Sequence, residues 1–291
     1  MESVETRTLS PGDLAEIVGV SESSIRRWVD AGRIDVMRTA GGHRRIPLRS
    51  ALRYVRENDL QILRPDLLGM PGLTARAAHE ELTADALFDL LQAGDAAAVR
   101  GAVAGAFLHG MPLSELYDGP VAGALQRLGE LWRHGEEGIF VEHVATSICI
   151  EAVNEIRLLL PPPVDGAPVA LGGAVAADPY ILPSLMAASL FGEAGFRVVN
   201  LGPDTPSVAF LKAVDAHAPD VVWLAATGHF GAALVNTLVC DLVEPLEERD
   251  VDVVVGGRTA LAHRSLWPSC VTLLDSMGAL AEYARGYGSR G

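Results

Sequence analysis

The chain has 291 residues, of which 49% are hydrophobic and 21% are charged. This composition is typical of a folded protein and excludes a mostly disordered or fibrous chain, and the length predicts two or three bodies. The cysteines, Cys149, Cys240 and Cys270, lie far apart without CxxC spacing. This spacing argues against a disulfide framework or thiolate zinc site and fits a cytoplasmic location. The sequence shows no signal-peptide pattern and no apolar run of roughly 18 residues, so we expect no membrane span.

The net charge of −14 is unevenly distributed along the chain. Residues 1–65 hold 11 arginines against 9 acidic residues, a net charge of +2, whereas the remainder carries −16. An acidic body repels nucleic acid. Any contact with DNA must therefore come from the N-terminal 65 residues.

Two short helices are predicted near the N-terminus. Ser10, followed by proline, is typical of a helix N-cap, and the helix that it starts ends at Gly19. Ser21 predicts a second cap, for a helix that ends at Gly32. This order is the plan of a helix-turn-helix, and we expect Trp28 to lie in its core.

Residues 34–48 predict a β-hairpin that turns at Gly41 and Gly42. Basic side chains gather on this hairpin, as in a wing beside a helix-turn-helix, and others lie on the outer side of the second helix. We expect DNA to be contacted by Ser23, Ser24, Arg26, Arg27, Arg38, His43, Arg44 and Arg45. The strings LSPGDLAEIVGVSESSIRRWVDAGRI and RTAGGHRRI resemble the MerR-type winged helix-turn-helix. We place this domain at residues 1–65, with a last helix at about 49–58.

A linker at about 65–77, which contains prolines and glycines, separates this domain from a helical region. Residues 78–160 have a helical apolar pattern with breaks at 94–95, 109–112 and 133–139, which predicts a four-helix bundle. The segment LPPPVDGAP, residues 160–168, is a second linker.

Residues 167–291 alternate between short, continuously apolar strands and helices. The strands are PVALGGAVA, FRVVNLG, VVWLAAT, VDVVVGG and CVTLLDS, and the helices lie at about 183–194, 206–217, 230–248, 259–265 and 277–287. Continuous apolar strands are typical of a sheet that is covered on both faces. The pattern predicts a Rossmann-like, doubly wound parallel sheet whose ligand lies at the carboxyl ends of the strands.

The order of the three bodies resembles the CarH and LitR family of light-responsive transcriptional repressors. The family's bundle motif is a Trp, nine residues and then Glu-His, and this chain has Trp132, Glu142 and His143. The resemblance implies that these residues cap the upper face of adenosylcobalamin. A large flat indole and a carboxylate–imidazole pair suit an adenosyl group.

The motifs for the lower face of the corrinoid are only partly present. The family's Asp-x-His-x-x-Gly reads DPYILP here, with Asp178 kept, Tyr180 in place of the histidine and Pro183 in place of the glycine. Residues 225–227, AAT, stand where Ser-x-Leu is expected, whereas the glycine pair at 256–257 matches. A protonated phenol is a poor cobalt ligand, so the histidine-ligated mode is not predicted. The candidate cofactor-binding residues are Trp132, Glu142, His143, Asp178, Tyr180, Thr227, His229, Gly256 and Gly257.

Three interpretations of the ligand follow from these residues. The first is adenosylcobalamin without a cobalt ligand from the protein, and the second is another tetrapyrrole such as a bilin or haem, with Tyr180, His143 and His229 as contacts. The third is a body that binds no ligand and acts alone or through a protein partner. In each case we expect a DNA-binding regulator, by resemblance a repressor that self-associates as a dimer or tetramer. We expect no enzymatic activity, because no catalytic constellation or substrate domain is recognised.

Overall fold

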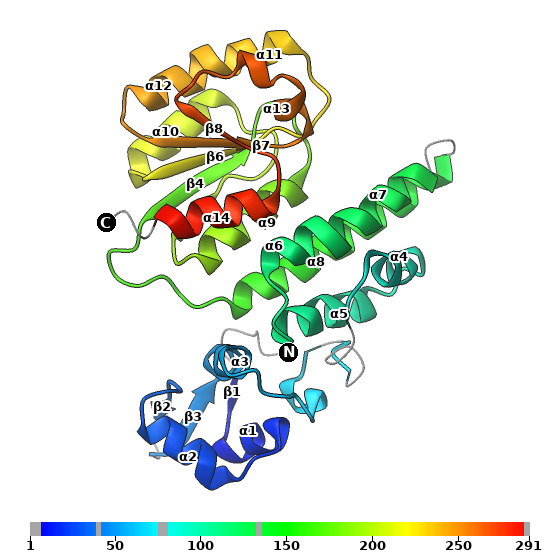
Figure 1. Ribbon diagram of the computed structural model, residues 1–291, viewed down its shortest axis with the longest axis vertical. Coiled ribbons are helices and arrows are strands. Elements are labelled where there is room, and N and C mark those ends of the chain that lie inside the picture. The colour runs from blue at the N-terminus through cyan, green and yellow to red at the C-terminus, as the bar shows by residue number, and fades with distance from the viewer. Residues whose placement is uncertain (1–6, 39–41, 71, 75–80, 132–135, 288–291) are drawn as a thin grey trace. The chain divides into compact units, whose positions relative to one another are not determined.

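The computed structural model describes residues 7–38, 42–70, 72–74, 81–131 and 136–287. The chain divides into two compact units, Met1–Pro161 and Pro162–Gly291. Figure 1 shows the helices and strands of each unit. The division falls in the predicted linker at 160–168, and both of the bodies predicted before this linker lie in the first unit.

The first unit begins with a helix-turn-helix and a small antiparallel sheet. Its helices are α1 (Pro11–Val18), α2 (Glu22–Asp30) and α3 (Leu48–Glu57), and its strands, in the order β1-β3-β2, are β1 (Thr8–Leu9), β3 (Arg44–Pro47) and β2 (Met37–Arg38). The antiparallel pairing of β2 and β3 confirms the two arms of the hairpin predicted for residues 34–48. The predicted turn at Gly41 and Gly42 includes residue 41, which lies outside the described residues. Strand β1 was not predicted, because two residues are too few to show a pattern.

Side-chain caps fix the starts of α1 and α2, as the sequence predicts. The Ser10 hydroxyl accepts a hydrogen bond from the Asp13 amide at 3.1 Å, and the Ser21 hydroxyl accepts one from the Ser24 amide at 3.2 Å. Trp28, predicted in the core, is only half-buried, and its ring lies 5.0 Å from that of Tyr54.

The rest of the first unit is helical. After a short 3-10 helix, η1, the chain forms longer helices that are interrupted at residues 94–95 and 109–112, as predicted. These elements are η1 (Pro65–Leu68), α4 (Ala84–Gln92), α5 (Ala96–Leu108), α6 (Leu113–Leu116), the π-helix η2 (Tyr117–Val121), α7 (Ala122–Leu131) and α8 (Glu136–Leu159). The predicted break at 133–139 is too long, because α8 already begins at Glu136. The π-turn of η2 contains Pro120, which has no N–H to donate to the preceding turn.

The second unit is a parallel sheet in the order β5-β4-β6-β7-β8, which confirms the prediction of a doubly wound α/β domain. Its strands are β4 (Val169–Ala174), β5 (Arg197–Asn200), β6 (Val221–Ala225), β7 (Asp252–Gly256) and β8 (Val271–Leu274). Its helices are α9 (Ile181–Glu193), α10 (Ser207–His217), α11 (Ala232–Leu238), the π-helix η3 (Val239–Val243), α12 (Glu244–Glu247), α13 (Arg258–Ala262), the 3-10 helix η4 (Arg264–Leu266) and α14 (Met277–Tyr287).

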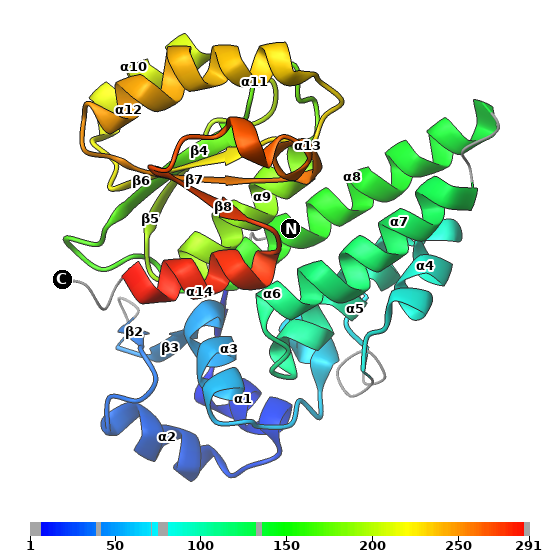
Figure 2. The same ribbon diagram turned by 45° about the horizontal axis from the view of Figure 1, so that its top comes forward.

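The helices cover both faces of this sheet. Figure 2 shows α9 and α14 on one face and α10, α11 and α12 on the other. Strands β4 and β6 are buried along their whole length, which explains their continuous apolar sequences. The strand order reverses between β4 and β6, so their carboxyl ends form the crevice where this class of fold binds ligands.

Aromatic side chains fill the layer between the sheet and α9. Trp223 of β6 stacks on Phe191 with ring centroids 5.4 Å apart, and its indole N–H donates to the buried hydroxyl of Ser184 at 3.2 Å. Gly172 of β4 makes this packing possible, because a Cβ at this position would lie 2.2 Å from the Trp223 ring. The layer is therefore closed by the protein's own side chains.

Candidate DNA interface and candidate ligand site

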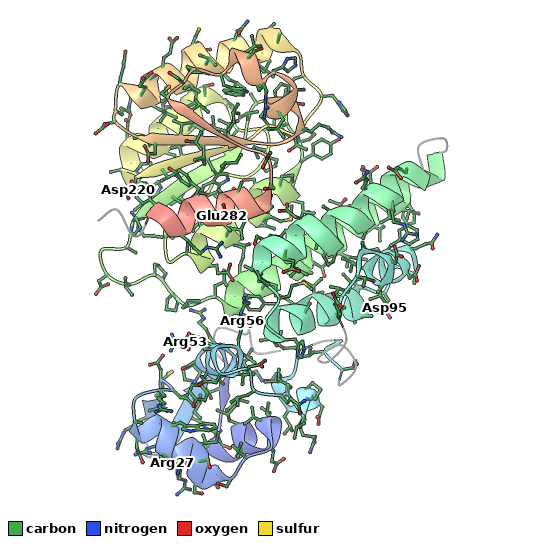
Figure 3. All side chains as sticks on the ribbon, in the orientation of Figure 1. Arg27, Arg53, Arg56, Asp95, Asp220 and Glu282 are labelled. Carbon is green, nitrogen blue, oxygen red and sulfur yellow. The ribbon has the colours of Figure 1, made fainter. Side chains whose placement is uncertain are left out.

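The outer surface of α2 carries the side chains that were predicted to read DNA. Ser23, Arg26 and Arg27 are exposed, and Figure 3 labels Arg27 on this helix. Ser24 is half-buried, and its hydroxyl lies 3.0 Å from that of Ser21. Ser24 thus lies in the first turn of α2 and contacts the N-cap residue Ser21, whereas the arginines are presented to solvent.

The β2–β3 hairpin adds a second group of basic side chains. Arg38 and Arg44 are paired across the strands and so lie on one face, while Arg45 pairs with Met37 and lies on the other. The Arg44 guanidinium is 2.7 Å from the Asp30 carboxylate at the end of α2. This ion pair joins the hairpin to the helix. His43 is exposed at the end of the hairpin.

A hollow of about 630 Å³ lies where α2, the start of α1 and the hairpin meet. It brings together Arg26, His43, Arg44 and Arg45 of the predicted set, while the remaining members are not among its lining residues. The residues that line it are Ser10, Pro11, Glu22, Arg26, Asp30, Gly42, His43, Arg44 and Arg45.

Two acidic residues of this surface, Glu22 and Asp30, were not among the predicted residues. The Glu22 carboxylate accepts hydrogen bonds from Nε and a terminal nitrogen of Arg26, at 3.1 and 2.7 Å. The i,i+4 spacing of this pair was a readable signal. The pairing of Asp30 with Arg44 had no such signal, because it depends on how the hairpin folds back.

The predicted upper-face motif lies on and before α8. Glu142 and His143 are exposed on this helix. Trp132 lies outside the described residues. The structure therefore places two of the three motif residues in the first unit and leaves their relation to the tryptophan a prediction.

In the second unit, Asp178 follows β4 and lies at the switch point between β4 and β6. It is completely buried. One carboxylate oxygen accepts from the Tyr180 amide at 3.1 Å, and the other accepts from the amides of Thr227 and Gly228 at 2.5 and 2.9 Å. The carboxylate thus connects the loop after β4 with the loop after β6, and the protein's own backbone uses both oxygens.

The glycine pair at the end of β7 serves a similar contact between loops. Gly257 has a φ of 111°, and a Cβ there would lie 2.5 Å from the carbonyl oxygen of Ala226. The Thr259 hydroxyl donates to the carbonyl of Gly228. Glycine is therefore required at 257 by the close approach of the neighbouring loop.

The exposed side chains at this edge include Tyr180, His229 and Arg258. Tyr180, at the N-cap of α9, is 38% exposed. The Arg258 guanidinium donates to the Thr227 carbonyl at 3.1 Å and lies 3.4 Å from Nε2 of His229. Arg258 was not among the predicted residues, because no spacing rule connects it to His229. Pro183 lies in the first turn of α9, where a backbone N–H is not needed.

These residues do not fit a corrinoid that is held by a histidine below cobalt. Position 180 offers a phenol, the Asp178 carboxylate is bonded to backbone amides, and Trp223 fills the layer under α9. Within the described parts of the chain, the structure contains no group of three or more histidine, cysteine or acidic side chains that could hold a metal ion. The described helices include none that is long and apolar enough to cross a membrane.

Comparisons with known proteins match both parts of the first unit. Residues 8–59 match a family described as a helix-turn-helix domain, and residues 83–157 match a family described as a B12 binding domain. The second match covers α4 to α8, the helical part of the unit. No curated protein matches the chain.

Among solved structures, the chain is similar to the monomethylamine corrinoid protein of Methanosarcina barkeri, with a TM-score of 0.51 and 16% identity over 69% of this chain and 96% of that one. This likeness shows a shared fold of helices followed by a parallel α/β sheet. A cobalamin-binding protein of Desulfitobacterium hafniense matches with a TM-score of 0.36 and 16% identity, over 70% of this chain and 98% of that one.

Proposed function

We propose that the protein is a transcriptional regulator that binds operator DNA through α2 and the β2–β3 hairpin. The hollow between these elements carries the proposal, because it joins arginines from both on one surface. In winged helix-turn-helix proteins of the MerR type, which this domain resembles, the second helix enters the major groove. The match of residues 8–59 to a helix-turn-helix family supports the same assignment.

Several finer parts of the proposal rest on the resemblance to the CarH and LitR regulators. They are repression, self-association as a dimer or tetramer, and the absence of an enzymatic activity. A self-associating regulator presents two recognition helices to a pseudo-palindromic operator, and control of association then controls DNA binding.

The DNA-binding assignment is tested by replacing Arg26 and Arg27 with Ala. Retardation of duplex DNA should weaken, and the dependence of log K on log salt should become shallower by about 0.9 for each phosphate that the variant no longer neutralises. Arg285→Ala, in α14, removes a charge from the second unit and serves as the matched control. Unchanged retardation by the double variant would contradict the assignment of α2.

The signal that controls the regulator has two candidate forms. In the first, the helical region binds adenosylcobalamin without a cobalt ligand from position 180, and light alters the assembly. The match of residues 83–157 to a B12 binding family favours this form. Glu142 and His143 on α8 would contact the ligand, together with Trp132, which precedes this helix in the sequence.

In the second form, the regulator does not bind a corrinoid and acts without a ligand, with a protein partner, or with another tetrapyrrole. The packing of Trp223 against Gly172 and the bonding of both Asp178 carboxylate oxygens to backbone amides favour this form. Both forms share the DNA-binding domain, so the ligand alone distinguishes them.

An absorption experiment separates the two forms. Protein purified in the dark is incubated with adenosylcobalamin, biliverdin or haem in separate samples, desalted, and sized before and after illumination. A retained corrinoid spectrum with a light-dependent change in size supports the first form. Retention of biliverdin or haem, or of no pigment, supports the second.

A further inference from the structure

The DNA-facing surface of the first unit contains two kinds of arginine. Arg26 is hydrogen-bonded through two nitrogens to Glu22, and Arg44 is paired with Asp30 at 2.7 Å. Arg27 and Arg45 are exposed, and within the described part of the chain no carboxylate is paired with either of them. Both carboxylates belong to α2. The carboxylate at the start of the helix holds Arg26 of the same helix, and the carboxylate at its end holds Arg44 of the hairpin.

The carboxylates change what this surface offers to DNA. In the hollow, three arginines face two carboxylates, so most of the arginine charge is compensated before DNA arrives. Phosphates attract arginines in any sequence, and each neutralised phosphate strengthens binding without regard to the bases. An arginine that is held by a carboxylate contributes little to this attraction unless the DNA offers a contact that replaces its hydrogen bonds.

A base edge with two acceptors can replace those hydrogen bonds. Guanine offers O6 and N7 to an arginine in the major groove, so the two nitrogens that Arg26 donates to a single oxygen of Glu22 would each gain an acceptor of their own. On a sequence without such an edge, the arginine stays with its carboxylate, and the carboxylate repels the phosphates nearby. Penalties of this kind against wrong partners are a general source of specificity.

We propose that Glu22 and Asp30 are specificity-determining residues, which withhold Arg26 and Arg44 from non-operator DNA and release them to the operator. This inference rests on the proposed function, because it assumes that α2 and the hairpin bind DNA. It adds that acidic residues of the surface, and not its arginines alone, set the ratio of operator to non-operator affinity. Arg27 and Arg45 supply the attraction that is common to all sequences.

The test compares Glu22→Gln and Asp30→Asn with the unchanged full-length protein on two probes. One probe is a pool of random 30-base-pair duplexes, and the other is the duplex that the unchanged protein enriches from that pool by repeated selection. Glu57→Gln, at the exposed end of α3, removes the same charge elsewhere in the domain and is the control. Circular dichroism checks that the variants keep their helices.

We expect each of the two variants to bind the random pool roughly two- to fivefold more tightly, which is the range of an exposed ion pair. The affinity of the variants for the enriched duplex should increase less, because Arg26 and Arg44 already contact this duplex in the unchanged protein. On random DNA, the slope of log K against log salt should steepen by about 0.9 for each released arginine. Between 50 and 200 mM salt, the affinity should therefore change by an additional factor of about three for each released arginine.

Two results would overturn the inference. One is that the variants bind both probes like Glu57→Gln. The other is that they bind both probes more weakly, which would show that the carboxylates only position the arginines. If the unchanged protein retards neither the pool nor any enriched duplex, the proposed DNA-binding function itself fails, so the two failures are distinguishable.

Discussion

Asp178 belongs to a ligand motif of the family that the chain resembles, but its carboxylate is already bonded to the protein's own backbone. Its buried carboxylate accepts from the amides of Tyr180, Thr227 and Gly228 and so connects the loops after β4 and β6. A buried acceptor of this kind is costly to remove, because the amides that it satisfies lose their partners. The first role of Asp178 is therefore to hold the edge of the sheet.

Asp178→Asn should destabilise the second unit by about 2 kcal/mol, because an amide has one acceptor oxygen for three backbone donors. Urea unfolding measures this change. Asp250→Asn is the matched control, since Asp250 is exposed and its φ of 56° suits asparagine. Equal stability of the two variants would show that the carboxylate is not a structural contact.

The buried thiol of Cys149 should make the stability of the first unit depend on pH. The thiol is 2% exposed, and burial raises its pKa from 9.0 to about 12. The folded state therefore keeps a proton that the unfolded state releases above pH 9. The stability from this group is fully present below pH 9 and is lost as the pH rises toward 12.

Above pH 9, the free energy of unfolding should fall more steeply with pH in the unchanged protein than in Cys149→Ala. The two slopes should differ by about 1.4 kcal/mol per pH unit. Urea titrations at pH 8 and pH 10.5 measure the difference, and the cost of the cavity cancels because it does not depend on pH. Cys240→Ala, at an exposed thiol, is the control and should titrate like the unchanged protein. Parallel curves for Cys149→Ala and the unchanged protein would contradict the prediction.

At the scale of elements, α3 connects the helix-turn-helix to the helical part of the first unit. The Arg56 guanidinium lies 3.8 Å from the centre of the Phe107 ring of α5, and Figure 3 shows Arg56 on the side of α3 that faces these helices. Nε of Arg49 donates to the Leu158 carbonyl in the last turn of α8 at 3.2 Å. The helix that carries Glu142 and His143 is thus in hydrogen-bond contact with the DNA-binding domain.

A double-mutant cycle of Arg56→Met and Phe107→Leu should give a coupling of about 0.5–2 kcal/mol, the range of a partly desolvated cation–π contact. Thermal or urea unfolding supplies the four stabilities. Arg53→Met replaces Arg56→Met in the control cycle, because Arg53 is paired with Asp35 instead. A coupling no larger than that of the control cycle would show that α3 and α5 are not joined by this contact.

At the scale of the whole molecule, the two units are joined by an exposed segment. Residues 161–166 are all exposed, and the segment holds three consecutive prolines and no helix or strand. Exposed loops outside regular structure are preferred sites of proteolysis. The segment also contains Asp165, which a protease specific for acidic residues can cleave.

Brief digestion with such a protease should first cut after Asp165 and leave fragments of residues 1–165 and 166–291. Mass spectrometry identifies the fragments. Asp165→Asn should remove this cut and leave slower cuts elsewhere. A first cut inside either compact unit, with Asp165 intact, would contradict the division of the chain.

Local sequence signals determined much of the fold. The hydroxyl caps at Ser10 and Ser21 start α1 and α2 because each satisfies an amide of the first turn. The glycine turn near residue 42 predicts the hairpin, and the continuous apolar strands predict the buried parallel sheet. The charge of the first 65 residues, opposite to that of the rest, predicts that any contact with DNA comes from this domain. Such features can be read from residues that are neighbours in the sequence.

Only the tertiary structure decided what the candidate site residues contact. Spacing cannot show that Asp178 is used by amides 49 and 50 residues away, or that Trp223 fills the space that Gly172 leaves. It also cannot show that Asp30 holds Arg44, since the hairpin must fold back onto α2 first. These contacts join segments that are distant along the chain, and their geometry depends on packing. The sequence by itself therefore determined the elements and predicted which surface meets DNA, whereas the fold decided which arginines of that surface are paired with carboxylates and which groups at the sheet edge are already bound.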